Sequence, residues 1–478
     1  MFFNSLSFAL FLPIVFVLYW FVFNKTKSLQ NGLLIVASYY FYSCWDWRFL
    51  FLLIFSTALD YFSGIQIEKS NSVTHRKIWF WVSISINLGF LCVFKYYDFF
   101  AVSFTQLLYG FGFSVNPSLI RLILPVGISF YTFHGLSYVI DVYKKRIEAE
   151  RNFVDYSLFV SYFPLLVAGP IERATHLLPQ VKVKRTFDYH KAKEGISQIV
   201  WGLFKKVVIA DSCAMFANDI FNHYDKMNSL TLVLGAIYFA FQIYGDFSGY
   251  SDIALGTSKL FGINLLRNFN YPYFSRDIAE FWRRWHISLS SWFRDYLYIP
   301  LGGSKGGMKS KIRNTFIIFI VSGFWHGANW TFIFWGALNA VYFLPLLITN
   351  NNRNNIDIVA KGKYLPSIKD FFKILFTFSL TTFAWIFFRS KNITDAFSYI
   401  KRIFSFNLEG KIQYLSIERY SVELLLLLFG FIIVEWFSRE HEHPFFGKIA
   451  YIKLLIVICL IIVLGVFSQA SDFIYFQF

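Results

Sequence analysis

Long apolar stretches separated by short polar loops dominate the chain. A helix that crosses a bilayer needs ~20 residues, and a shorter run can span when flanking Tyr, Trp, Lys or Arg reach the interface. The pattern therefore predicts an all-α polytopic membrane protein with about ten or eleven crossings and some partial ones. The apolar runs are Phe8–Phe23, Leu33–Trp45, Phe49–Phe62, Ile78–Phe94, Leu119–Val142, Ile196–Phe216, Leu230–Tyr244, Phe316–Phe324, Phe332–Ile348, Ile374–Phe388, Leu424–Phe437 and Leu454–Phe467.

The basic residues of the loops predict an orientation. Lys25 and Lys27, placed inside, make the N-terminus external, and the basic loops Glu68–Lys77 and Lys144–Arg151 then also fall inside. The first apolar run lacks the basic n-region of a signal peptide, so we expect it to remain as a membrane anchor.

The longest region without a clean spanning run is Gly249–Arg313. Within it, apolar residues recur at steps of three and four over Phe281–Tyr296, which predicts one continuous amphipathic helix. Arg283, Arg284 and Arg294 lie off this aromatic stripe. We expect the helix to lie in the membrane interface, with these arginines toward water and lipid phosphates.

The next segment predicts a polar group deep in the membrane. The run Asn314–Trp325 climbs roughly 18 Å at ~1.5 Å per residue, which places His326 at about mid-membrane. Gly327 follows directly, so the backbone is expected to break there. Irregular backbone at this depth is tolerated only where it lines a cavity or is buried in protein.

Composition agrees with a membrane protein. Of 478 residues, 56% are hydrophobic, 22% aromatic and 15% charged, against about a quarter charged in soluble proteins. The formal charge of +16 would suggest nucleic acid in a soluble protein. Here the basic residues cluster in loops and are explained by orientation, so no nucleic-acid partner is expected. We predict one membrane-embedded domain over residues 1–478.

Two histidines are candidates for chemistry. An ionisable residue at mid-membrane suggests function, and His326 suits a general base acting on a hydroxyl. The alternative is a neutral histidine hydrogen-bonded in the core. His286 is a candidate second catalytic or positioning group, although its spacing favours an interfacial histidine that touches lipid head groups.

A polar cluster ends the Leu230–Tyr244 run. Asp246–Asp252 holds two carboxylates and three hydroxyls, which form either a polar pocket or a structural network between helices. The four cysteines occur singly, and no H-E-x-x-H or C-x-x-C pattern is present. No bound metal is expected.

Six sequence blocks lie in the middle of the chain, from Val167 to Trp330. They are Val167–Arg173, Asp246–Asp252, Arg267–Tyr273, Glu280–Leu289, Phe293–Gly303 and Trp325–Trp330. In this order the blocks resemble the membrane-bound O-acyltransferase family, and within it the alginate-acetylating branch. Their combination is more specific than any one of them.

The resemblance implies a helical bundle with re-entrant and interfacial helices that enclose a tunnel. It places His326 at the family's invariant histidine and His286 at its second one. Asn339 stands where relatives are expected to carry a histidine, which argues against a third-histidine role. The residues assigned to substrate or donor binding are Asp246, Ser248, Tyr250, Asn268, Asn270, Arg283, Arg284, Arg294, Trp325 and Asn329.

The function expected from this resemblance is acetyl transfer across a bacterial inner membrane. The donor is a cytosolic thioester, acetyl-CoA or another acyl carrier, and no cofactor is bound permanently. The acceptor is a hydroxyl of an exported polysaccharide or of a periplasmic acyltransferase partner. Two alternatives stay open: D-alanyl or peptidoglycan acylation by the same fold, and transport of an acylated substrate without chemistry.

Overall fold

The computed structural model describes residues 1–120, 122–167, 169–409, 421–467 and 473–474. Within these residues the regular structure is helical and contains no strand, which confirms the all-α prediction. Among the described residues, five helical segments are long and apolar enough to cross a membrane, and two shorter apolar helices accompany them. The number of crossings and the tunnel stay predictions. The five segments are Arg48–Lys69, Val73–Gly110, Ser229–Leu260, Trp330–Ile348 and Ile368–Arg389.

The chain packs as two compact units, Met1–Ile196 with Ala254–Leu266, and Ser197–Ile253 with Arg267–Phe478. Helices α10 (Tyr189–Leu203) and α12 (Ser229–Leu260) have residues in both units. The prediction of a single domain is not tested by this division.

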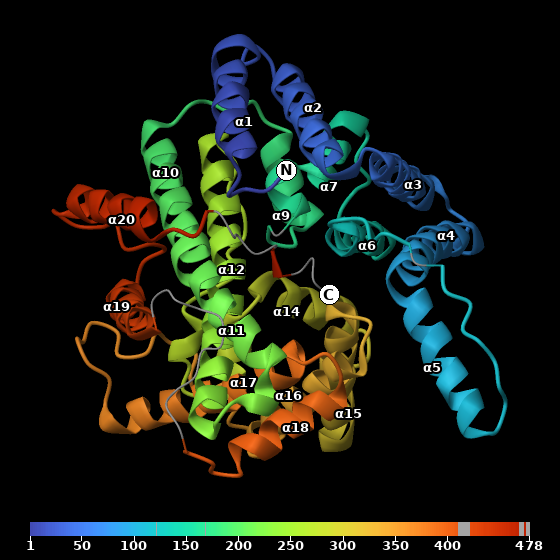
Figure 1. Ribbon diagram of the computed structural model, residues 1–478. Coiled ribbons are helices and arrows are strands. Elements are labelled where there is room, and N and C mark those ends of the chain that lie inside the picture. Colours follow the sequence, from blue (N-terminus) through green and yellow to red (C-terminus); the bar gives the residue numbers. More distant parts are fainter. Residues whose placement is uncertain (121, 168, 410–420, 468–472, 475–478) are drawn as a thin grey trace. The chain divides into compact units, whose positions relative to one another are not determined.

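The first unit is built from α1 to α9. Figure 1 shows α5 projecting away from its other helices. A buried polar group links α3 and α4, because the Asp60 carboxylate accepts hydrogen bonds from Ser83 Oγ at 2.6 Å and Asn87 Nδ2 at 2.8 Å. The helices are α1 (Leu6–Val17), α2 (Lys27–Asp46), α3 (Arg48–Lys69), α4 (Val73–Leu91), α5 (Tyr97–Gly110), α6 (Ile128–Tyr143), α7 (Phe153–Ser161), α8 (Phe163–Leu166) and α9 (Ala174–Val181), with π-helical turns η1 (Leu18–Val22) and η2 (Cys92–Tyr96).

The second unit holds the remaining elements. They are η3 (Phe204–Ala210), α11 (Asp211–Asn222), η4 (Tyr224–Lys226), η5 (Pro272–Phe274), α13 (Ile278–Arg284), α14 (Ile287–Phe293), η6 (Arg294–Tyr298), α15 (Gly307–His326), α16 (Trp330–Ile348), α17 (Ile368–Arg389), α18 (Ile393–Ile403), α19 (Ser421–Ser438) and α20 (Ala450–Leu464).

Helices α15 and α16 form a closely packed hairpin within the second unit (Figure 1). Glycines make this packing possible. A Cβ atom added at Gly323 would clash with the backbone oxygen of Phe332, and one added at Gly336 would clash with that of Phe319. The two backbones therefore approach more closely than any residue with a side chain would permit.

Candidate functional site

His326 is the last residue of α15. Gly327 is extended, and α16 begins at Trp330, where the Asn329 side chain accepts a hydrogen bond from the Thr331 N–H at 3.0 Å. The predicted backbone break directly after His326 is confirmed. Its local cause is the glycine followed by an N-capping asparagine, which ends one helix and starts the next. His326 itself is buried, with 4% of its surface exposed.

His286 occupies a second break in the backbone, and here the sequence-based prediction was wrong. The segment 281–296 is not one helix: α13 ends at Arg284, α14 starts at Ile287, and His286 between them has the left-handed φ of 42°. The apolar stripe still faces inward, since Phe281, Trp285 and its other members are buried.

The orientation predicted for Arg284 was also wrong. Its guanidinium is buried and pairs with the Glu280 carboxylate at 2.8 Å, and it donates to the backbone oxygens of Asn270 and Asp357. A buried carboxylate one turn earlier gives this arginine a partner that outcompetes lipid phosphate. Near it, the Arg276 guanidinium donates to the exposed Asp357 carboxylate and lowers its pKa.

One cavity of about 220 Å³ brings both histidines together. His286 is only 1% exposed, which argues against the prediction that it touches lipid head groups. The wall from α15 consists of Thr315, Ile318, Phe319, Ser322 and His326. These residues follow one another at helical steps, so the wall extends along α15 for about 17 Å at ~1.5 Å per residue.

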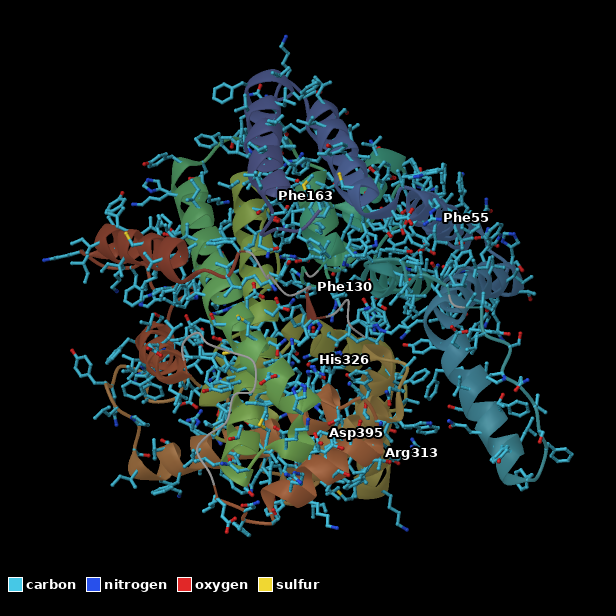
Figure 2. The ribbon with its side chains drawn as sticks, viewed as in Figure 1. Phe55, Phe130, Phe163, Arg313, His326 and Asp395 are labelled. Carbon is cyan, nitrogen blue, oxygen red and sulfur yellow. The ribbon has the colours of Figure 1, made fainter. Side chains whose placement is uncertain are left out.

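The end of this cavity away from His326 is cationic. Arg294 and Arg353 line it together with Tyr298, Ser304 and Asn352. Figure 2 labels Arg313 and His326 on α15, which begins at Gly307 and ends at His326, so Arg313 lies nearer the start of the helix. The cavity therefore joins an anion-attracting mouth to two buried imidazoles, which suits a long substrate with a charged head and a reactive tail.

Sequence reasoning missed Arg353. It follows α16 in a polar stretch of asparagines. The feature of the sequence that could have indicated it is the abrupt end of the apolar run at Ile348. Arg283 connects it to the site by donating hydrogen bonds to the backbone oxygens of Asn352 at 2.8 Å and Asn355 at 2.7 Å. Arg283 thus holds the loop that carries Arg353.

The Asp246 group does not line the cavity. Asp246 pairs with Lys206 Nζ at 2.8 Å and accepts the Ile474 N–H at 2.7 Å. Lys206 also pairs with Asp211 at 2.9 Å. Tyr250 and Ser248 are buried on the same helix, α12. These contacts favour the structural-network interpretation over the polar pocket.

The remaining predicted residues surround the site without entering it. The Trp325 ring contacts both histidines, with ring-centre distances of 6.2 Å to His286 and 4.9 Å to His326. Asn329 caps α16 and donates to the Lys391 oxygen at 2.9 Å. Asn268 and Asn270 bind backbone on either side of His286. Of the predicted binding residues, all of which lie in the described part of the chain, only Arg294 lines the cavity.

No group of three or more His, Cys, Asp or Glu in the described ranges could hold a metal ion. The cavity lining offers imidazole and guanidinium groups together with the hydroxyls of serine, threonine and tyrosine side chains. Neutral imidazole can accept a proton from an alcohol, and guanidinium can bind phosphate.

Comparison with known proteins identifies the family of this chain. The model of the membrane-bound O-acyltransferase family matches residues 144–388, more than half of the chain, and the match includes both histidines. The chain belongs to the membrane-bound O-acyltransferase family. It is thus an O-acyltransferase and a multi-pass membrane protein, and the cavity at His326 is the candidate active site of a family member.

Individual relatives of the chain include acetyltransferases and a D-alanyltransferase. The chain is 38% identical to the probable alginate O-acetylase AlgI of Azotobacter vinelandii, over 89% of this chain and 82% of that protein. It is 36% identical to the peptidoglycan O-acetyltransferase of Helicobacter pylori, over 83% of this chain and 78% of that one. The teichoic acid D-alanyltransferase of Streptococcus thermophilus is 30% identical over 45% of this chain and 55% of its own length.

Proposed function

We propose that this protein transfers acetyl groups from a cytosolic thioester, acetyl-CoA, to a hydroxyl on the far side of a bacterial inner membrane. The acceptor is an exported polysaccharide or a periplasmic acyltransferase partner that completes the transfer. The observation that carries the proposal is that one cavity is lined by both His326 and His286. The same cavity is lined by Arg294 and Arg353, which form its cationic mouth. Two of the relatives named above are described as acting on alginate and peptidoglycan, which supports an acetyl donor and a polymer acceptor.

In the proposed mechanism, His326 acts as the general base. It takes the proton of the acceptor hydroxyl, and the oxygen attacks the thioester carbonyl. The C–S bond then breaks, the carbonyl re-forms as an ester, and the imidazolium returns the proton to the leaving thiolate. Charge and atoms balance without a further reactant. Base catalysis of this kind is typically worth ~10²–10⁴ in rate.

His286 is the second proposed catalytic group. Asn268 and Asn329 bind backbone and do not line the cavity, whereas His286 does. A neutral imidazole N–H from His286 would stabilise the oxyanion of the tetrahedral intermediate. Arg294 and Arg353 would hold the phosphates of the donor, because guanidinium matches phosphate geometry.

The test is acetyl transfer from radiolabelled acetyl-CoA in membranes that contain the full chain. Labelled polymer and released thiol are both measured for wild type, His326→Gln and a control, His190→Gln, whose side chain is exposed in the first unit. The rate of acetyl transfer should be lower than wild type by a factor of ~10²–10⁴ in His326→Gln. The control should match wild type. Normal transfer by His326→Gln with impaired export of acetylated material would refute the proposal and favour the transporter alternative.

A further inference from the structure

A short segment without regular secondary structure, Asn268–Asn270, binds the backbone on both sides of His286. The Asn268 oxygen accepts the Ile287 N–H at 2.9 Å, and the Asn270 N–H donates to the Arg284 oxygen at 3.0 Å. These two hydrogen bonds replace the helical ones that the break between α13 and α14 removes. His286 therefore lies in the middle of a bracket formed by residues distant from it in sequence.

The Asn268 side chain adds the specific part of this bracket. Its Oδ1 accepts the Ser288 Oγ–H at 2.6 Å and the Ser288 N–H at 3.4 Å, at the start of α14. Asn268 is fully buried, and Ser288 is 2% exposed. Because water does not compete at this depth, loss of one partner leaves the other buried without this hydrogen bond.

The conformation of His286 needs such support. A φ of 42° is unfavourable for any residue with a side chain, and it persists only where the surroundings impose it. Relaxing the backbone toward an ordinary helix would turn the imidazole to a different face. Phe247, 4.6 Å from His286 between ring centres, holds the ring but cannot fix the backbone dihedral.

We propose that Asn268 is a positioning residue that holds His286 in its left-handed conformation and so directs the imidazole into the cavity, rather than a residue that contacts the donor. Its effect on acetyl transfer passes through His286. The inference rests on the proposed function for its kinetic test, and its chemical test is independent of that function.

The kinetic test is a double-mutant cycle in the full chain with radiolabelled acetyl-CoA. Asn268→Ala should lower kcat by about 10²-fold with little change in KM, because a displaced catalytic group costs about this much. In the His286→Ala background, the same change should cost nothing further. Equal losses in both backgrounds, or a loss confined to KM, overturn the proposal.

A milder variant and a matched control keep the proposal testable if Asn268→Ala does not fold. Ser288→Ala removes one hydroxyl and should show a smaller loss that also vanishes in the His286→Ala background. Asn31→Ala removes a fully buried asparagine in the first unit that donates to Asp155 and to the Val181 oxygen. This control should lower the amount of folded protein but leave kcat of the folded fraction unchanged. An additive loss with Ser288→Ala overturns the proposal even if Asn268→Ala does not fold.

The chemical test follows the carbethoxylation of His286 by diethyl pyrocarbonate, read by mass spectrometry of the full chain. The rate should rise several-fold in Asn268→Ala or Ser288→Ala, because the ring leaves its packing against Phe247, and should stay unchanged in Asn31→Ala. If wild type transfers no acetyl, the proposed function fails and this rate alone decides the positioning role. Equal rates in wild type and both bracket variants would overturn it.

Discussion

Gly323 sets the distance between α15 and α16, and its replacement by alanine probes how closely His326, the proposed catalytic base, depends on that distance. A Cβ atom at Gly323 would lie closer to the Phe332 oxygen than the 3.0 Å that real Cβ atoms keep, and 3.3 Å from the Gly336 Cα. The obstacles are backbone atoms, which cannot rotate away. Alanine at this position therefore forces the two helices apart.

The size of the effect follows from this geometry. Clearing the clash separates the helices by on the order of 1 Å, and a displacement of that size costs about 10²-fold in rate when it reaches a catalytic group. His326 lies three residues after Gly323 on the same helix, so it moves with the strained turn. We expect kcat to fall by about 10²-fold and stability to fall by about 1–3 kcal/mol, as in overpacked cores.

The assay compares acetyl transfer and thermal unfolding in detergent for Gly323→Ala and a matched control, Gly430→Ala. Gly430 lies within α19, and a Cβ atom there meets nothing within 4 Å. Alanine should stabilise that helix by up to about 1 kcal/mol without affecting transfer. Wild-type kcat in Gly323→Ala, at wild-type stability, would show that the hairpin tolerates separation and would refute this reasoning.

Two further predictions concern charge. Lys206→Met removes the ammonium between Asp211 and Asp246, whose side chains are 1% and 3% exposed. It should destabilise the protein by about 3–5 kcal/mol, seen as a lower unfolding temperature, and an unchanged temperature would contradict the buried-pair account. Arg353→Glu at the cavity mouth should raise KM for acetyl-CoA by about tenfold at constant kcat, whereas Lys361→Glu, exposed and outside the cavity wall, should not. Equal KM values for acetyl-CoA in Arg353→Glu and Lys361→Glu would show that Arg353 does not bind the donor.

The sequence by itself determined that the chain lies in a membrane and that a helix ends at His326. Apolar runs of membrane length fix an all-α membrane protein, because backbone groups in hydrocarbon must be satisfied within the helix. The end of α15 at His326 was also predictable, since Gly327 and the capping residue Asn329 act on their immediate neighbours. The family resemblance likewise rested on contiguous motifs, and comparison with the family confirmed it.

Only the tertiary structure decided where His286 lies and which arginines line the cavity. The periodicity of segment 281–296 is helical throughout, yet the helix breaks at His286, where the Asn268 oxygen accepts the Ile287 N–H and the Asn270 N–H donates to the Arg284 oxygen. His286 lines the cavity together with His326. Arg284 turned inward for the same kind of reason, a buried partner at Glu280. Such contacts join residues distant in the chain, and sequence periodicity reports only which face of an isolated helix is apolar. The free energy that selects a local conformation here comes from those distant partners, so local pattern could not reveal it.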